Sequence, residues 1–270
     1  MDLIWQEGHI KVLISIITVV YNDKFNLEKT IKSVICQTHK NIEFIVIDGN
    51  STDGTLDVIH KYEKYISYWI SEKDDGLYDA MNKGISQASG DFINFLMAGD
   101  TIKERHSLES VSSKMINHST SYYSRAIILS EIGRWVYPPH GVESEKVWLK
   151  NNLPNFQTVF LSKKMYKLNN FDIRLKLTAD DDYKLIAIRG GGLDFIDEEF
   201  VEFRRDGISS NHKSISLFIQ RVRESIIINL KHKRYVRLFL DPVKRLITFA
   251  IHFSFGDRIF LKFIKKIKKI

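Results

Sequence analysis

Acidic and amide side chains follow each of four short apolar runs in the first hundred residues. The groups are Thr18 with Tyr21 and Asn22, Asp48 to Ser51, Asp74 with Asp75, and Gly99 with Asp100. If the runs are neighbouring parallel strands, their carboxyl ends meet at one edge of a sheet, where open α/β sheets bind ligands. Carboxylates gathered there repel one another unless a cation or a donor-rich ligand lies between them. We therefore predict a ligand site at this edge, although turn and helix-cap chemistry explains each group taken alone.

Several common cofactor and metal motifs are missing from the sequence. It has no Walker A motif, no G-x-G-x-x-G fingerprint and no H-E-x-x-H pair. The nine histidines lack metal-ligand spacing, and we interpret His212 as a loop residue. The single cysteine, Cys36, excludes an internal disulfide framework and a cysteine-based zinc cluster. The Gly190–Gly192 run is interpreted as the end of a helix rather than a phosphate-binding loop.

The elements that must position the four groups alternate between strand and helix. Four runs rich in β-branched and aromatic residues predict buried strands, and the segments between them carry apolar residues at helical spacing. The predicted strands are Val12–Tyr21, Glu43–Asp48, Ile66–Ser71 and Phe92–Met97. The predicted helices are Phe25–Gln37, Thr55–Tyr65 (with N-cap side chains from Ser51–Asp53) and Tyr78–Ser89. This alternation predicts an α/β fold with a mostly parallel sheet flanked by helices.

The second half of the chain is less regular. Strands are expected at Ser121–Ile128, Arg134–Tyr137 and Leu193–Phe203, and a helix at Asp180–Arg189. Two later apolar stripes have helical spacing: Phe218, Val222, Ile226 and Leu230, then Phe260, Phe263, Ile264 and Ile267. We therefore divide the chain into a main domain, residues 1–212, and a basic, amphipathic, helical C-terminal extension, residues 213–270.

Charge is distributed unevenly along the 270 residues. The net charge of +7 divides into −5 for residues 1–212 and +12 for residues 213–270. A basic extension favours a polyanionic partner. The extension matches no nucleic-acid module, so we expect it to bind an anionic membrane surface and no nucleic acid. The simpler interpretation of its apolar stripes is that they are the core-facing sides of ordinary helices. No apolar run reaches the ~20 residues of a membrane-spanning helix and the start lacks a secretory signal, so a cytoplasmic location is expected.

Four segments resemble family 2 glycosyltransferases of the GT-A fold: SIITVVYND, EFIVIDGNSTDGT, SEKDDGLYDAMNKGISQASGD and FINFLMAGD. The resemblance covers about residues 11–101 and continues more weakly through LPNFQ, LTADDDYKL and EFRRDGISS. The sequence most resembles bacterial enzymes that build surface polysaccharides, such as the colanic-acid and O-antigen transferases. This resemblance implies inverting transfer of a sugar from a nucleotide donor, most often a UDP-sugar, with a divalent metal, Mg²⁺ or Mn²⁺.

The resemblance also implies site residues. Those for the donor are Thr18, Tyr21, Asp48, Asp75, Asn82 and Lys83. Asp48 would accept a hydrogen bond from the uracil, although many relatives carry Asp-Asp where this chain has Asp48-Gly49. Asp100 resembles the last acid of the D-x-D metal motif, whose first acid is replaced by Ala98. Metal would then be held by one carboxylate, diphosphate oxygens and water, which Mg²⁺ tolerates.

The segment TADDDYKL resembles the part of the family that carries the catalytic base. An inverting enzyme needs a carboxylate that deprotonates the acceptor hydroxyl while the diphosphate leaves from the opposite face. Counting from Phe171-Asp172 selects Asp180, our assignment, whereas counting back from Tyr183 selects Asp182. The three adjacent acids, Asp181 included, are expected to raise one another's pKa. An acid-rich helix start is the simpler interpretation.

The predicted function is an inverting hexosyl- or N-acetylhexosaminyltransferase. It would use a lipid-linked or saccharide acceptor in bacterial surface polysaccharide synthesis, such as that of lipopolysaccharide O-antigen, at the inner face of the cell membrane. One alternative is a degenerate GT-A domain that scaffolds a membrane assembly, because the D-x-D motif is incomplete. Another is a sugar nucleotidylyltransferase, which needs a Gly-rich basic loop after the first strand, and Val20–Asp23 is not one.

Overall fold

The computed structural model describes residues 12–130, 133–139, 152–204 and 214–250. Nine strands form one sheet in the order β3-β2-β1-β4-β8-β6-β9-β5, with β7 paired to β6. The strands are β1 Ile14–Val20, β2 Ile42–Asp48, β3 Tyr68–Ser71, β4 Phe92–Phe95, β5 Thr101–Ile102, β6 Ser121–Ser130, β7 Gly133–Tyr137, β8 Val159–Ser162 and β9 Leu193–Arg204. The helices are α1 Lys24–Ile35, α2 Thr55–Tyr62, α3 Leu77–Gln87, α4 Ser107–Ser112, α6 Lys163–Leu168, α7 Ala179–Gly190 and α8 Ile215–Lys231, with short 3₁₀ turns at Glu63–Tyr65 and Phe156–Thr158.

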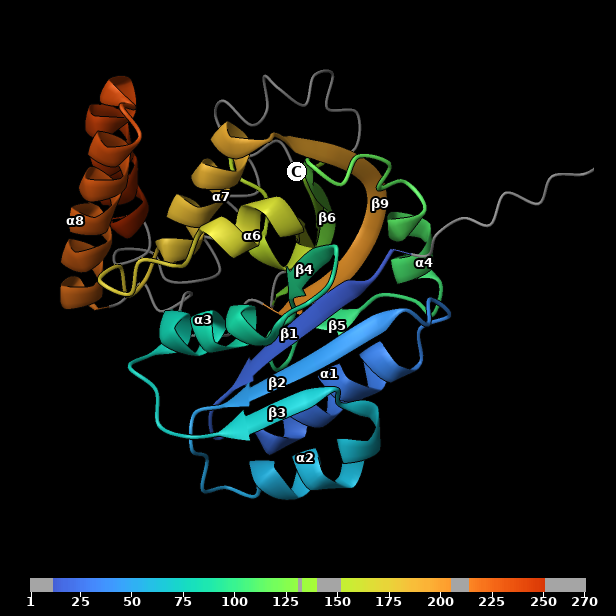
Figure 1. Cartoon of the computed structure of the whole chain (residues 1–270). Coiled ribbons are helices and arrows are strands. Elements are labelled where there is room, and N and C mark those ends of the chain that lie inside the picture. Colours follow the sequence, from blue (N-terminus) through green and yellow to red (C-terminus); the bar gives the residue numbers. More distant parts are fainter. Residues whose placement is uncertain (1–11, 131–132, 140–151, 205–213, 251–270) are drawn as a thin grey trace, which may run out of the picture.

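The first half of the sheet is parallel, as predicted. β1 runs parallel to β2 and to β4, and β3 runs parallel to β2. The register pairs Val20 with Asp48 and Asp48 with Ser71, so the ends of β1, β2 and β3 coincide. Helices α1 and α2 cover one face of these strands and α3 covers the other (Figure 1). Apolar side chains are therefore needed on both faces, which explains the continuous apolar runs in the sequence.

The second half of the sheet is mixed. β8 runs antiparallel to both β4 and β6, while β9 runs parallel to β6. The predicted strands and helices of this half are found close to their expected bounds, and α7 ends at Gly190 as expected. The sequence analysis missed β5, β8, α4 and α6, which have two to six residues each. Elements so short do not complete enough periods to be recognised by spacing.

The C-terminal segment lies beside α7. α8 is followed by further helix over residues 235–250, and Figure 1 shows this pair next to α7, away from β1–β3. The buried side chains of α8 are Glu224, Ser225, Ile228 and Asn229, so the predicted stripe from Phe218 to Leu230 is not its core face. The second predicted stripe, Phe260–Ile267, lies outside the described residues. Among the described helices, none is long and apolar enough to span a bilayer.

Candidate active site

The loops that follow β1 and β2 are joined by polar contacts. The backbone N–H of Asn22 donates to Oγ of Ser51 (2.7 Å), and the N–H of Thr52 donates to Oδ1 of Asn22 (2.8 Å). Asp53 accepts from the N–H of Thr55 (3.0 Å), while the N-cap position of α2 is taken by Gly54 rather than by the predicted Ser51–Asp53. The polar residues of the DGNSTDGT segment thus fix the shape of the sheet edge.

Thr18, Tyr21 and Asp48 occupy three different environments at this edge. Asp48 is buried and accepts from the N–H of Ser51 (3.0 Å), from Oγ of Ser51 (2.5 Å) and from Oγ of Ser71 (2.6 Å). Thr18 is also buried, and its hydroxyl donates to the carbonyl of Leu96 (2.7 Å). The Tyr21 side chain is 64% exposed. Its ring is therefore open to a ligand, beside the buried side chains of Thr18 and Asp48.

Asp74 fills the space beside Gly49. A Cβ atom added to Gly49 would lie 2.7 Å from Oδ2 of Asp74 and 3.3 Å from Cδ2 of Tyr21. A carboxylate from the loop after β3 therefore lies next to Gly49, the position at which many relatives carry a second Asp. The sequence analysis had selected Asp75, which is exposed, and had not distinguished the role of Asp74.

Asn82 and Lys83 of α3 make contacts within the protein. The Asn82 amide donates to the carbonyl of Phe171 (3.0 Å) and accepts from its N–H (2.8 Å). Lys83 donates to the carbonyl of Lys73 (3.0 Å) and pairs with Glu72 (2.8 Å). Burial alone would lower the pKa of Lys83, but Glu72 and the nearby acids raise it above its usual value. Lys83 therefore carries a full charge, and it ties α3 to the loop that follows β3.

Asp100 is buried at the turn after β4. The hydroxyl of Thr30, on α1, donates to the Asp100 carbonyl (2.8 Å) and accepts from the N–H of Gly99 (3.0 Å). Within the described residues, no three His, Cys, Asp or Glu side chains come together as potential metal ligands. Metal binding by the single carboxylate of Asp100, completed by diphosphate oxygens and water, therefore stays a prediction.

The three acids at the start of α7 point to different partners. Asp180 accepts from the hydroxyl of Tyr78 (2.9 Å) and pairs with Lys184 (3.0 Å), which also pairs with Asp181 (2.8 Å). Asp182 lies against the end of α8, 2.6 Å from Nζ of Lys231 and 2.7 Å from Nε2 of His232. The Asp180 side chain is 27% exposed, against 2% for Asp182. Of these two, Asp180 is therefore the one that is open to solvent.

The expected mutual rise in pKa is wrong for two of these acids. Burial alone would raise the pKa of Asp181 and of Asp182, yet both are lowered. Lys184 stabilises the charged form of Asp181, and hydrogen bonds from His232 and Lys231 stabilise that of Asp182. The sequence analysis considered the acids only as one another's neighbours, whereas cations from α7 and α8 dominate their surroundings.

Three contacts join α3 to the segment that leads into α7. They are the Tyr78–Asp180 hydrogen bond, the double contact between Asn82 and Phe171, and a bond from Nζ of Lys176 to the carbonyl of Asp75 (2.9 Å). Asp75 and Asp180, far apart in the chain, therefore lie on adjoining segments at the same edge. Tyr78 was missed as a site residue because only the fold reveals its partner.

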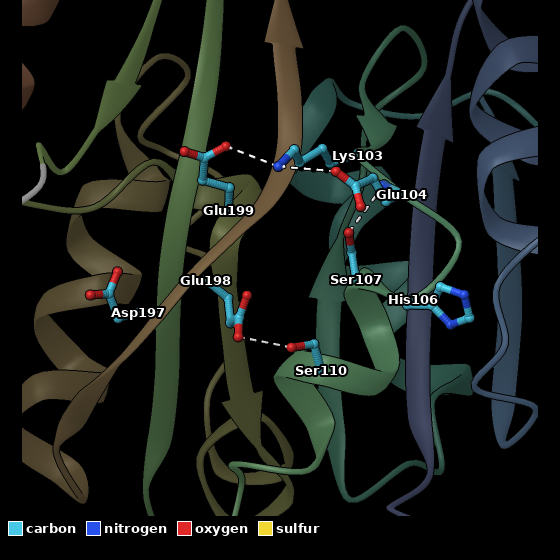
Figure 2. Close-up of a pocket in the computed structure, with 8 residues that line it drawn as sticks. All are labelled: Lys103, Glu104, His106, Ser107, Ser110, Asp197, Glu198 and Glu199. Carbon is cyan, nitrogen blue, oxygen red and sulfur yellow. Dashed lines mark hydrogen bonds and ion pairs between the residues drawn. The ribbon is translucent and has the colours of Figure 1, made fainter.

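A separate cavity of about 400 Å³ lies between α4 and β9 (Figure 2). Its lining includes Glu198, bound to Ser110 and Lys114, and Glu199, paired with Lys103. α4 lies near the amino ends of the parallel strands, because His39 bridges Ser112 of α4 to the carbonyl of Val12, just before β1. This cavity is therefore distinct from the carboxyl edge of the parallel strands, where Asp48 and Asp74 lie.

Sequence comparisons show the family of this chain. Residues 15–177 match the family model described as glycosyl transferase family 2. An uncharacterized glycosyltransferase of Mycobacterium tuberculosis is 30% identical over 213 residues, which is 76% of this chain and 80% of the relative. TuaG of Bacillus subtilis, a glycosyltransferase provisionally assigned to teichuronic acid biosynthesis, is 31% identical over 161 residues, 57% of this chain and 63% of TuaG.

Solved structures share the fold at lower identity. Residues 1–349 of TarS from S. aureus, in complex with UDP-GlcNAc, superpose with a TM-score of 0.66 at 18% identity, over 90% of this chain and 73% of that one. The mannosyltransferase PcManGT from Pyrobaculum calidifontis, in complex with GDP-Man and Mn²⁺, superposes with a TM-score of 0.60 at 14% identity, over 84% and 65%. The fold class is confirmed, and the family match over more than half of the chain shows that this protein belongs to glycosyl transferase family 2.

Proposed function

We propose that the chain is an inverting glycosyltransferase that moves a sugar from a UDP-sugar to a hydroxyl of a lipid-linked or saccharide acceptor. The observation that carries this proposal is the 2.9 Å hydrogen bond between Tyr78 and Asp180. It brings a partly exposed carboxylate to the start of α3, directly after the loop that holds Asp74 and Asp75. Transfer in one displacement step requires a base close to the bound donor, and here both proposed sites lie on adjoining segments.

On the donor side, Tyr21 is proposed to stack on the uracil, with Thr18 and Asp48 behind it. Asp48 already accepts from two serines, so its contact with a nucleotide needs either a further lone pair or a shift of Ser71. Asp75, Asn82 and Lys83 are proposed as the next part of the donor site, with the Lys83 ammonium near the diphosphate. The donors bound in the TarS and PcManGT structures support a nucleotide-sugar.

The charge of the leaving diphosphate needs a partner. We propose Asp100 as the protein ligand of Mg²⁺ or Mn²⁺, which would neutralise the charge that develops on the diphosphate. The Mn²⁺ in the PcManGT structure supports a metal in this fold. Asp100 follows β4, the neighbour of β1 in the sheet, and therefore lies on the same edge as Asp48.

On the acceptor side, Asp180 is proposed as the general base. Tyr78 and Lys184 each bind one of its oxygens, and a carboxylate keeps further lone pairs for an acceptor hydroxyl. We prefer Asp180 to Asp182 because Asp182 is buried against α8, and to Asp181 because Tyr78 holds Asp180 at the start of α3. The nucleophilic hydroxyl would lose its proton to Asp180 as the sugar–phosphate bond breaks on the opposite face.

The C-terminal extension, residues 213–270, is proposed to bind an anionic membrane at its cytoplasmic face. Over residues 235–250 most of the large exposed side chains are apolar, namely Val236, Phe239, Leu240, Val243, Leu246 and Ile247, although Lys244 is exposed too. Arg237, Asp241 and Arg245 are half-buried beside Leu238 and Phe249, so the charged groups are not confined to the outer face as they are in a helix that meets water. This pattern, in a segment of charge +12, supports a surface that meets lipid.

The pathway is proposed to be the synthesis of a bacterial surface polysaccharide. The assignment of TuaG to teichuronic acid biosynthesis supports this class. The sequence resemblance to colanic-acid and O-antigen transferases points to the same class of product. Whether the transferred group is a hexosyl or an N-acetylhexosaminyl group is the question for the donor experiment.

The first test measures the melting temperature of the protein with each of a panel of UDP- and GDP-sugars in the presence of Mn²⁺. The second measures the release of UDP when lipid-linked saccharides are added as acceptors. A UDP-sugar should raise the melting temperature, and NMR of the product should show the anomeric configuration inverted. Stabilisation without transfer to any acceptor would favour the scaffolding alternative. Release of pyrophosphate from a nucleoside triphosphate and a sugar phosphate would favour a nucleotidylyltransferase.

A further inference from the structure

Glu224 is a buried acid on the inner side of α8. Its side chain is 3% exposed, although α8 belongs to a segment with fifteen Lys and Arg but three acids. Burying a carboxylate is unfavourable unless donors satisfy its oxygens. The donors that Glu224 uses indicate why the acid is there.

Three consecutive residues, Lys176 to Thr178, donate hydrogen bonds to Glu224. The N–H of Lys176 reaches Oε1 (2.9 Å), and the N–H of Leu177 reaches Oε2 (3.0 Å). The hydroxyl of Thr178 also reaches Oε2 (2.8 Å), and Gln220, one turn earlier on α8, donates to Oε1 (2.9 Å). One carboxylate therefore fixes the backbone and a side chain of the segment that enters α7.

Thr178 is the N-cap residue of α7, yet its side chain makes no cap hydrogen bond to the helix. A threonine at this position ordinarily accepts from an N–H of the first turn. Here the hydroxyl donates to Glu224 instead, so the helix start is held from outside, by α8. Asp180 lies two residues beyond Thr178, in the first turn.

We propose that Glu224 is a positioning residue for the transfer reaction: it fixes the start of α7 and thereby directs the Asp180 carboxylate toward the acceptor. This rests on the proposed role of Asp180 as base. Glu224 does not itself touch the donor edge, and Asp75 has separate support from its N–H bond to Asp79 (3.1 Å). A displacement of about 1 Å in a catalytic group can reduce the rate by up to about 100-fold.

The test compares Glu224→Gln with Glu224→Asp and Asn229→Ala in the full-length chain. Gln keeps the shape but places an NH₂ group against backbone donors, while Asp keeps the charge with a shorter reach. Asn229 is buried on the same helix and its amide donates to Asp241 (3.0 Å), outside the α7 segment, so it controls for general loosening of α8. The measurements are kcat and KM for the donor, and hydrogen exchange of residues 174–185.

Glu224→Gln should lower kcat by about 10- to 100-fold, leave the donor KM within about twofold, and speed exchange in residues 174–185 but not in α3. Glu224→Asp should recover part of kcat, and Asn229→Ala should keep it. Unchanged exchange in Glu224→Gln would show that Glu224 does not hold this segment. Faster exchange with normal kcat, or an equal loss in Asn229→Ala, would overturn the positioning role.

The two levels of the proposal fail in different ways. If the wild-type chain transfers no sugar, the proposed function fails and the positioning role fails with it, whereas the exchange data still report whether Glu224 holds the segment. If the wild type is active and Asp180→Asn is too, Asp180 is not the base, and a loss of kcat in Glu224→Gln would no longer act through it.

Discussion

The Tyr78 hydroxyl donates a 2.9 Å hydrogen bond to Oδ1 of Asp180, a residue 102 positions later in the chain. Burial and the charge of Asp180 raise the pKa of Tyr78 far above its usual value, so the phenol keeps its proton and acts as a donor at every working pH. Lys184 binds the other oxygen, Oδ2 (3.0 Å). The orientation of the proposed base is thus set by groups from two helices.

Tyr78→Phe should lower turnover without changing donor affinity. The Tyr78 hydroxyl holds Oδ1 of Asp180, so its loss leaves the carboxylate less well oriented. Because a misplacement of about 1 Å in a catalytic group can reduce the rate by up to about 100-fold, kcat should fall by about 10- to 100-fold. The measurements are kcat and the donor KM for both proteins. Equal kcat values would mean that the Tyr78–Asp180 contact does not act on the base.

Asp180→Asn should abolish most turnover. Asn keeps the shape of the side chain but cannot accept the acceptor proton, so kcat should fall by roughly 10²–10⁴-fold, the usual contribution of a general base. UDP affinity should stay within about twofold. If Asp182→Asn is the inactive variant instead and Asp180→Asn keeps its rate, the base has been placed two residues too early.

Asp182→Asn should reduce stability in a pH-dependent way. His232 and Lys231 lower the pKa of Asp182 in the folded chain against the opposing effect of burial, so its stabilisation is present above the unfolded-state pKa and is lost as the pH falls through the folded-state pKa. At pH 7 the free energy of unfolding should drop by about 2–3 kcal/mol, as for hydrogen bonds to charged groups. The deficit should shrink in acid.

Urea unfolding at neutral and acidic pH measures this difference. The matched control is Asp194→Asn, an exposed acid on β9, which should change the free energy of unfolding by less than about 0.5 kcal/mol. An equal deficit at both pH values would assign the effect of Asp182→Asn to packing rather than to charge.

The strands and helices of the parallel half could be predicted from sequence because both faces of β1 and β2 are buried, which leaves a continuous apolar run. The partners of the site residues could not. Asn82 was expected at the donor, yet its amide binds the backbone of Phe171, and a donor contact from it stays a prediction. The lowered pKa of Asp182 depends on Lys231 and His232, about fifty residues later in the chain, which no local spacing encodes.

Glu224 shows what signal was present and overlooked. An acid within a strongly basic segment is isolated from like charges and must have its own partner if it is buried. Composition and spacing led us to treat the segment as a basic, amphipathic extension without asking what its few acids bind. The helix was correctly expected, but its buried face is polar because it binds α7 rather than an apolar core.

Asp100→Asn should remove the metal-dependent part of donor binding. The side chain keeps its shape and one oxygen but loses the charge that a divalent cation requires. Calorimetric titration of UDP with Mn²⁺ should show at least about tenfold weaker binding than in the wild type, and the two proteins should bind UDP equally in EDTA, which is the control. Equal affinity with Mn²⁺ would place the metal elsewhere or exclude it from donor binding.

The last prediction concerns the C-terminal extension and separates its charge from its apolar face. Each Lys or Arg near an anionic leaflet contributes about 1 kcal/mol, which salt screens, while inserted apolar side chains add a salt-insensitive part. The full-length protein should bind vesicles that contain phosphatidylglycerol far better than neutral vesicles.

Phe239 is 73% exposed and Val243 56% exposed, so Phe239→Ser with Val243→Ser should leave the fold intact. This double variant should lose the binding that persists at high salt, whereas Gln at the lysines from 262 to 269 should lose the part that salt removes. Co-sedimentation at low and high salt measures both, and UDP affinity should not change in either variant because the donor edge lies in the first hundred residues. If both variants sediment like the wild type, the extension is not the membrane element, and its exposed apolar side must contact protein instead.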